Sequence, residues 1–99
     1  MPYNKATLLL HHKNIYADGA IVEMKAWAVP RSRNKPEGIK YALAYIDENG
    51  VRILGYDNAE GKGHHRHLGD QEAPAPFESL EMLVEIFLKE VGSLRGKIS

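Results

Sequence analysis

A short segment in the second half of the chain concentrates side chains that could act on a phosphate. Three of the five histidines, one lysine and one arginine occupy the six positions 62–67, and glycines stand on both sides of the lysine. Imidazole can take and give a proton near neutrality, because its ordinary pKa is about 6.5. Arginine keeps its charge and offers a planar fork that fits phosphate oxygens. This set matches metal-free RNA cleavage, which needs a base for the 2′-hydroxyl, an acid for the leaving oxygen and cations for the charge that develops on phosphorus.

Two other interpretations of this segment stay open. Consecutive histidines and an arginine at a sheet edge are also typical of a solvated surface loop. A metal site is the second alternative, because imidazole is a common ligand for zinc, copper and nickel. His65 and His67 alternate on an extended chain, and the ligand set could be completed by Asp57, Glu72 or His64. We rank a metal site below these other interpretations and expect no cofactor, since the helical HExxH spacing is absent and Arg66 would put a cation among the ligands.

The first 57 residues predict the strands that must position this segment, because apolar and polar residues alternate between turn signals. We expect four strands, at about 5–13, 20–29, 39–46 and 51–56. The pair Asn49-Gly50 predicts a tight hairpin turn. In the second strand the alternate positions 20–28 are all apolar and should face the core. Its other face carries Glu23, Lys25 and Trp27, a polar and aromatic set that a cross-strand ion pair explains equally well.

The last part of the chain predicts a long loop followed by a helix. Residues 57–76 show no periodicity, which indicates a long loop. Apolar residues at three- and four-residue spacings then predict a helix over 80–91, with Ser79 as N-cap, Gly92 as stop, and acidic residues including Glu90 on the solvent side. The sequence therefore predicts one α+β domain over residues 1–99, a four-stranded antiparallel meander covered by one C-terminal helix.

Composition and charge narrow the class of protein. The chain is 43% hydrophobic and 26% charged, which is typical of a globular domain and argues against a disordered or fibrous protein. It has no cysteine, and its longest early apolar run, at 6–10, is too short for a signal peptide or a membrane span. We therefore expect a cytoplasmic protein without membrane contact. The net charge of +0 conceals a basic half, because residues 1–40 carry seven Lys and Arg against three acidic residues.

The order of these motifs resembles the TumE-type toxins of bacterial and archaeal toxin-antitoxin modules. The resemblance covers nearly the whole chain, and its specific part runs from Gly-Tyr-Asp-Asn at 55–58 through Gly-Lys-Gly at 61–63 to His-Arg-His at 65–67. It implies a toxin that inhibits growth through RNA and whose neighbouring gene encodes a helix-turn-helix antitoxin. His64 stands where the family pattern has an acidic residue. The residues that match the motif are Asp57, Lys62, His65, Arg66 and His67.

We therefore expect the toxin component of a toxin-antitoxin module, acting on RNA as a metal-independent endoribonuclease. His65 and His67 would be the acid and the base in either order, and Asp57 would orient a histidine. The substrate-binding residues would be Lys62, Arg66, Tyr56 and His64. Two alternatives remain, a non-catalytic module that binds nucleic acid or protein and a metal-dependent hydrolase built on the histidine segment. The sequence leaves open the RNA target and whether the chain forms a homo-oligomer.

Overall fold

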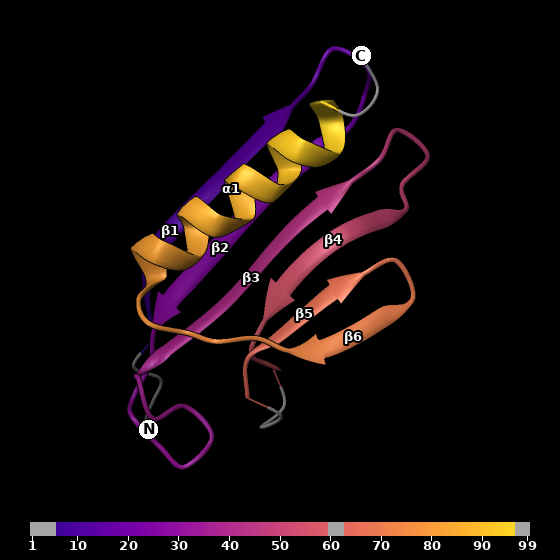
Figure 1. The fold of residues 1–99 in the computed structure, drawn as a ribbon. Helices are drawn as coiled ribbons and strands as arrows, with labels where there is room; N and C mark the ends of the chain where they lie inside the picture. The colour runs from indigo at the N-terminus through magenta and orange to yellow at the C-terminus, as the bar shows by residue number, and fades with distance from the viewer. Residues whose placement is uncertain (1–5, 60–62, 97–99) are drawn as a thin grey trace.

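The computed structural model describes residues 6–59 and 63–96, which form one antiparallel sheet and one helix (Figure 1). The elements are β1 (Thr7–Ile15), β2 (Ile21–Ala28), β3 (Ile39–Ile46), β4 (Arg52–Asp57), β5 (His65–Leu68), β6 (Gln71–Pro74) and α1 (Leu80–Gly96). The strands pair in the order β1-β2-β3-β4-β5-β6, and each runs antiparallel to its neighbours. The described chain is therefore a continuous meander that ends in a helix.

The predicted α+β class, with a C-terminal helix over an antiparallel meander, is confirmed, but the prediction of four strands is wrong. The segment that lacked periodicity contains β5 and β6, which are four residues each and polar. They form because β5 pairs its backbone with the edge of β4, so little apolar patterning is needed. Gly69 has a φ of 59° in the turn between them, a conformation that glycine adopts without steric cost.

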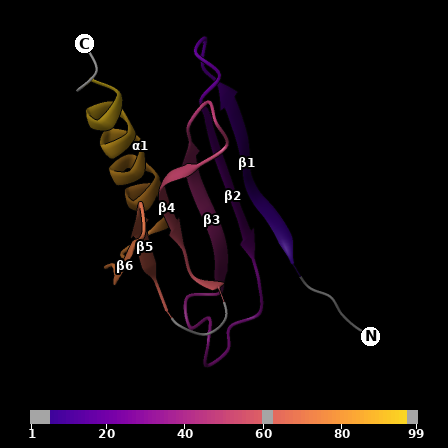
Figure 2. The same cartoon turned by 90° about the vertical axis from the view of Figure 1, so that its right-hand side faces the viewer.

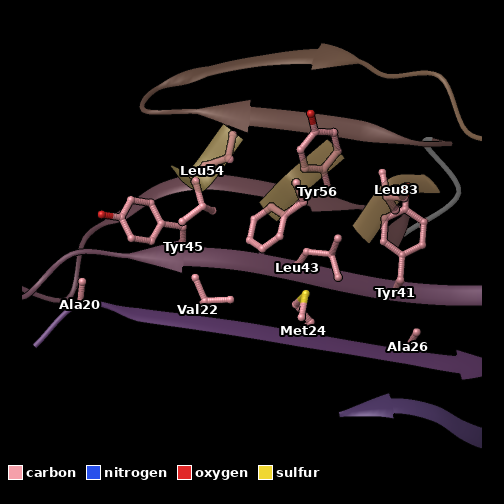
Figure 3. Packing of buried hydrophobic residues seen from close by; sticks show 12 residues of the cluster. Ala20, Val22, Met24, Ala26, Tyr41, Leu43, Tyr45, Leu54, Tyr56 and Leu83 are labelled. Atoms are coloured by element: carbon pink, nitrogen blue, oxygen red, sulfur yellow. The ribbon is translucent and has the colours of Figure 1, made fainter. Parts of the chain in front are cut away.

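Helix α1 lies over one face of the sheet and encloses the core (Figure 2). The alternating positions of β2 predicted to face the core are confirmed, since Val22, Met24 and Ala26 are buried. Helix residues at the predicted spacing, Leu83, Phe87 and Val91, are buried against them. The rest of the core comes from alternating positions of β3 and β4 (Figure 3), namely Tyr41, Leu43, Tyr45, Leu54 and Tyr56.

The helix begins at the predicted cap but runs past the predicted stop. The Ser79 hydroxyl accepts a hydrogen bond from the backbone N–H of Met82 at 3.1 Å, as an N-cap does. Gly92 lies inside the helix, which continues to Gly96. The last turn is held by Arg95, whose guanidinium lies 3.7 Å from the ring centroid of Tyr16 and donates to the Tyr45 hydroxyl at 3.1 Å. These contacts outweigh the weak helix propensity of a single glycine.

The opposite face of the sheet is covered by no other described element, and we call it the open face. Its centre consists of two rows of residues that lie directly opposite one another in successive strands. The first row is His11, Lys25, Ala42, Asp57, His65 and Pro74. The second row is Lys13, Glu23, Ala44, Gly55, His67 and Glu72. The sequence-predicted acid and base therefore reach the open face rather than the core.

Asn58, the last residue of the Gly-Tyr-Asp-Asn motif, is 2% exposed and joins β3 to the end of β4. Its side-chain oxygen accepts from the backbone N–H of Tyr41 at 3.0 Å, and its amide donates to the carbonyl of Ile39 at 2.7 Å. Both backbone groups would be buried without a partner if this side chain were absent. The motif residue Asn58 thus has a structural role.

We expect Asn58→Ala to lower the free energy of unfolding by about 2–4 kcal/mol, because two buried backbone groups lose their hydrogen-bond partner. Urea denaturation followed by circular dichroism measures this change. Asn34→Ala is the matched control, since Asn34 is exposed and its truncation should cost less than about 0.5 kcal/mol. Equal denaturation midpoints for the two variants would contradict the structural role.

Candidate active site

Strand β5 distributes the histidine segment over two faces of the sheet. Side chains alternate along a strand, so His65 and His67 lie on the open face, while Arg66 faces the helix. His64, which directly precedes the strand, lies on the side of Arg66 and contacts Tyr41. Lys62 lies outside the described residues. Neighbours in sequence are therefore separated in space.

The two open-face histidines each have a carboxylate partner. His67 donates from Nε2 to Oδ2 of Asp57 at 3.1 Å, and Nδ1 of His65 lies 2.7 Å from Oε2 of Glu72. The centroids of the two imidazole rings are 6.5 Å apart, and the ring planes are inclined by 28°. The carboxylate of Asp57, which accepts from the ring nitrogen of His67, fixes the orientation of that ring, and Glu72 lies within ion-pair distance of His65. This arrangement brings together the predicted Asp57, His65 and His67.

Glu72 and Arg52 complete this cluster, although neither was predicted to take part in the cleavage chemistry. Glu72 lies directly opposite His67 on β6, and recognising a hairpin at Gly69-Asp70 would have placed it there. A Cβ built on Gly55 would lie 3.1 Å from Cδ and 3.4 Å from Nη1 of Arg52. The guanidinium of Arg52 therefore extends over Gly55, the residue that pairs with His67. Within the described residues this arginine has no acidic partner.

Arg66 and Tyr56 belong to a second cluster, on the helix face. Arg66 donates from Nε to both carboxylate oxygens of Glu90, to Oε1 at 3.3 Å and to Oε2 at 3.1 Å, and also from Nη2 to Oε2. The Tyr56 hydroxyl donates to Oε1 of the same carboxylate. Burial and the bond to Glu90 raise the pKa of Tyr56 to about 12. Burial by itself would raise the pKa of Glu90, but the bonds from Arg66 and Tyr56 outweigh it and lower that pKa.

This cluster corrects the prediction that Glu90 faces solvent. Its carboxylate is turned towards β4 and β5, so it connects the helix to the sheet. Arg66 and Tyr56 lie on the face of the sheet opposite to His65 and His67. The structure therefore does not bring them together with the predicted acid and base.

His64 belongs to a third cluster, at the end of the sheet. Its Nε2 donates to Glu37 at 3.0 Å, its Nδ1 accepts from the Tyr41 hydroxyl at 2.8 Å, and its ring stacks on Phe77 with centroids 4.5 Å apart. The bond from His64 lowers the pKa of Glu37, while burial raises the pKa of Tyr41. Glu37 and Phe77 also line a cleft of about 710 Å³ near the start of α1.

Two further properties of the described geometry concern a metal site and a membrane span. Among residues 6–59 and 63–96, no group of three or more His, Cys, Asp or Glu side chains is arranged to hold a metal ion. No helix in the same part of the chain is long and apolar enough to cross a membrane.

Comparison with known proteins identifies one relationship for this chain. A family model described as Toxin TumE matches residues 5–95. The match confirms the resemblance seen in the motifs, and it covers strands β1 to β6 and all of helix α1 except Gly96. No curated protein and no solved structure matches the chain.

We expect Glu90→Gln to lower the free energy of unfolding by about 1–2 kcal/mol at neutral pH, because Arg66 loses a charged acceptor and both groups are partly exposed. The pKa of Glu90 is lowered in the folded state from its ordinary value of 4.5. The stabilisation is therefore complete above pH 4.5 and is lost as the pH falls through the folded-state pKa.

Urea denaturation of the two proteins at a series of pH values measures this difference. The wild type and Glu90→Gln should differ most at neutral pH and converge in acid. Glu85→Gln is the control, since Glu85 is an exposed glutamate on the same helix. A difference that stays constant down to strongly acidic pH would contradict a role for the charge of Glu90.

Proposed function

Because the chain belongs to the Toxin TumE family, we propose that it is the toxin of a toxin-antitoxin module and cleaves RNA as a metal-independent endoribonuclease. The observation that carries the proposal is the pair His65 and His67 on one uncovered face, each beside its own carboxylate. In such a cleavage the base must reach the ribose 2′-hydroxyl, and the acid must reach the 5′-oxygen that leaves the adjacent phosphorus. A separation of 6.5 Å between the ring centroids suits that requirement.

The two histidines divide the proton transfers of an internal cleavage. One neutral imidazole takes the proton of the ribose 2′-hydroxyl, whose oxygen then attacks phosphorus. The bond from phosphorus to the 5′-oxygen breaks, and the other histidine, which starts protonated, gives its proton to that leaving oxygen. The products are a 2′,3′-cyclic phosphate and a free 5′-hydroxyl. Asp57 and Glu72 lie beside the two rings and orient them.

Arg52 is the cation that we assign to the phosphate. Charge grows on the non-bridging oxygens as the 2′-oxygen attacks, and a preorganised guanidinium stabilises that charge. Arg52 lies over Gly55, beside His67 in the register of the sheet. It therefore takes the role that the sequence alone had suggested for Arg66.

The family implies an antitoxin partner in general. We assign this role to a helix-turn-helix protein encoded next to the toxin, and we place the RNA substrate in the cytoplasm. The antitoxin must neutralise growth inhibition when the two genes are expressed together. Co-expression of the two genes thus gives the reference state without growth inhibition, with which cells that express the variants below are compared.

We expect His67→Ala to lower the rate of RNA cleavage by about 10²–10⁴-fold, the usual contribution of one general acid or base. The rate is measured with purified protein and single-stranded RNA in the presence of a chelator, and the same variant should lose growth inhibition in cells. His65→Ala should behave in the same way.

His12→Ala is the matched control for this experiment. His12 is an exposed histidine that pairs with Met24 of the core-facing set, so it does not reach the open face. It should retain full activity. Equal cleavage by wild type and His67→Ala would overturn the catalytic assignment, and RNA binding without any cleavage would identify a non-catalytic binding module. Loss of activity in the chelator would identify metal-dependent hydrolysis.

We expect Arg52→Ala to lower cleavage by about 10²–10³-fold, as the loss of one charge-stabilising donor does. Gly55→Ala should lower cleavage in the same direction, because the added methyl group would lie 3.1 Å from the Arg52 side chain and displace it. Gly55 carries no positive φ, so its backbone accepts alanine and the thermal midpoint should stay within a few degrees of wild type.

Arg33→Ala is the control for charge alone, since Arg33 is an exposed arginine in the segment between β2 and β3. Full activity of Gly55→Ala together with reduced activity of Arg52→Ala would show that the position of Arg52 over Gly55 is irrelevant. Full activity of both would remove Arg52 from the proposed site.

A further inference from the structure

The open face continues from the histidine pair across the sheet to an aromatic residue. Trp27 on β2 lies opposite Lys40 on β3, next along these strands from the pair Lys25 and Ala42. Nζ of Lys40 is 6.0 Å from the centroid of the Trp27 ring, a cation–π distance. Trp27 is partly exposed and is the one tryptophan of the chain. A partly exposed indole beside a lysine is a surface on which a nucleic-acid base can stack.

The charges of the open face complement a polyanion. The acidic side chains of its two central rows are engaged: Glu23 lies 3.4 Å from His11 and 3.7 Å from Lys25, while Asp57 and Glu72 contact the histidine pair. Three cations on the same face have no acidic partner within the described residues, namely Lys13, Lys40 and Arg52. Unpaired cations along a surface attract successive phosphates of one strand.

The middle of the open face carries small residues on β3 and β4, and the Arg52 side chain lies over one of them, Gly55. Ala42 and Ala44 of β3 and Gly55 of β4 lie between the longer side chains of β2 and the histidines of β5. The same stretch of β3 places Tyr41, Leu43 and Tyr45 on the helix side. The unpaired bases of a single strand are free to stack on an aromatic ring such as that of Trp27, whereas the bases of a duplex are already stacked within the helix.

Building on the proposed cleavage at the histidine pair, we propose that the open face binds single-stranded RNA, with one base stacked on Trp27 and an adjacent phosphate at Lys40. Trp27 and the histidine pair are three strands apart. With strands spaced by about 4.8 Å, they are separated by on the order of 15–20 Å. The stacked base therefore belongs to a nucleotide several positions from the cleaved bond, and Trp27 selects longer substrates over dinucleotides.

The indole itself reports binding. A single-stranded RNA of about 12 nucleotides, added to the uncleaving His67→Ala protein, should quench the fluorescence of Trp27, and the same sequence as a duplex should quench it less. Anisotropy of the labelled RNA should show binding that is about 5- to 150-fold weaker for His67→Ala combined with Trp27→Ala. Trp27→Phe should restore most of the loss, because phenylalanine keeps a stacking surface.

Lys40→Ala should reduce the salt dependence of binding by about one phosphate contact, and Lys89→Ala, an exposed lysine on the helix, should leave it unchanged. With active protein, Trp27→Ala should slow cleavage of the longer RNA and leave cleavage of a dinucleotide unchanged.

RNA that is bound and cleaved without quenching of Trp27, or with equal affinity for Trp27→Ala, would overturn this subsite and leave the histidine mechanism standing. Quenching by RNA that the wild type does not cleave would support the binding surface and overturn the proposed reaction. Tight binding of duplex RNA with full quenching would contradict a single-stranded track.

Discussion

The backbone pairing of β5 with β4 is the constraint on which the rest of the site depends. Once Tyr56 pairs with Arg66 and Asp57 with His65, the period of two along a strand assigns every side chain of the segment to a face. His65 and His67 must share the open face, and Arg66 must point at the helix. The density of chemical groups in the sequence therefore does not produce one dense site. It produces a histidine pair on one face and an ion pair on the other.

The ion pair on the helix face helps to explain how the histidine pair is held on the open face, where its side chains are partly exposed. Glu90 accepts from Arg66 and Tyr56, so one carboxylate ties the helix to two adjacent strands. Such a partly buried pair contributes little to net stability over an apolar pair, but removing one partner leaves the other charge uncompensated. Its effect is to hold β5 at a fixed distance from the core. The short polar strand that carries the histidines is thereby kept in the sheet without covering its outer side.

The sequence predicts the elements in which buried residues recur with a regular period. It does not predict a strand that forms only because its backbone pairs with a neighbouring strand. The second strand and the helix were predicted with their correct buried faces, because Val22, Met24, Phe87 and Val91 must leave water. Strands β5 and β6 were not predicted, because they form by backbone pairing with the edge of the sheet and show no apolar alternation. That omission also explains why Arg66 was assigned to the substrate. Arg52 lies on the predicted fourth strand, but its position near His67 depends on the pairing of β4 with β5, which the sequence did not reveal. The face of a side chain cannot be known before its strand is recognised.

The composition of β3 gives an independent reason to regard the open face as functional. Its core side carries Tyr41, Leu43 and Tyr45, whereas its open side carries Ala42 and Ala44, and β4 adds Gly55 in the same row as Ala44. Alanine and glycine are poor strand formers, and a mid-strand glycine costs roughly 0.5–1 kcal/mol in conformational entropy. A face selected only for stability would carry branched or aromatic residues at these positions. Proteins are expected to give up local stability at functional sites, and here the small residues lie beside His65 and His67, whose ring centroids are 6.5 Å apart.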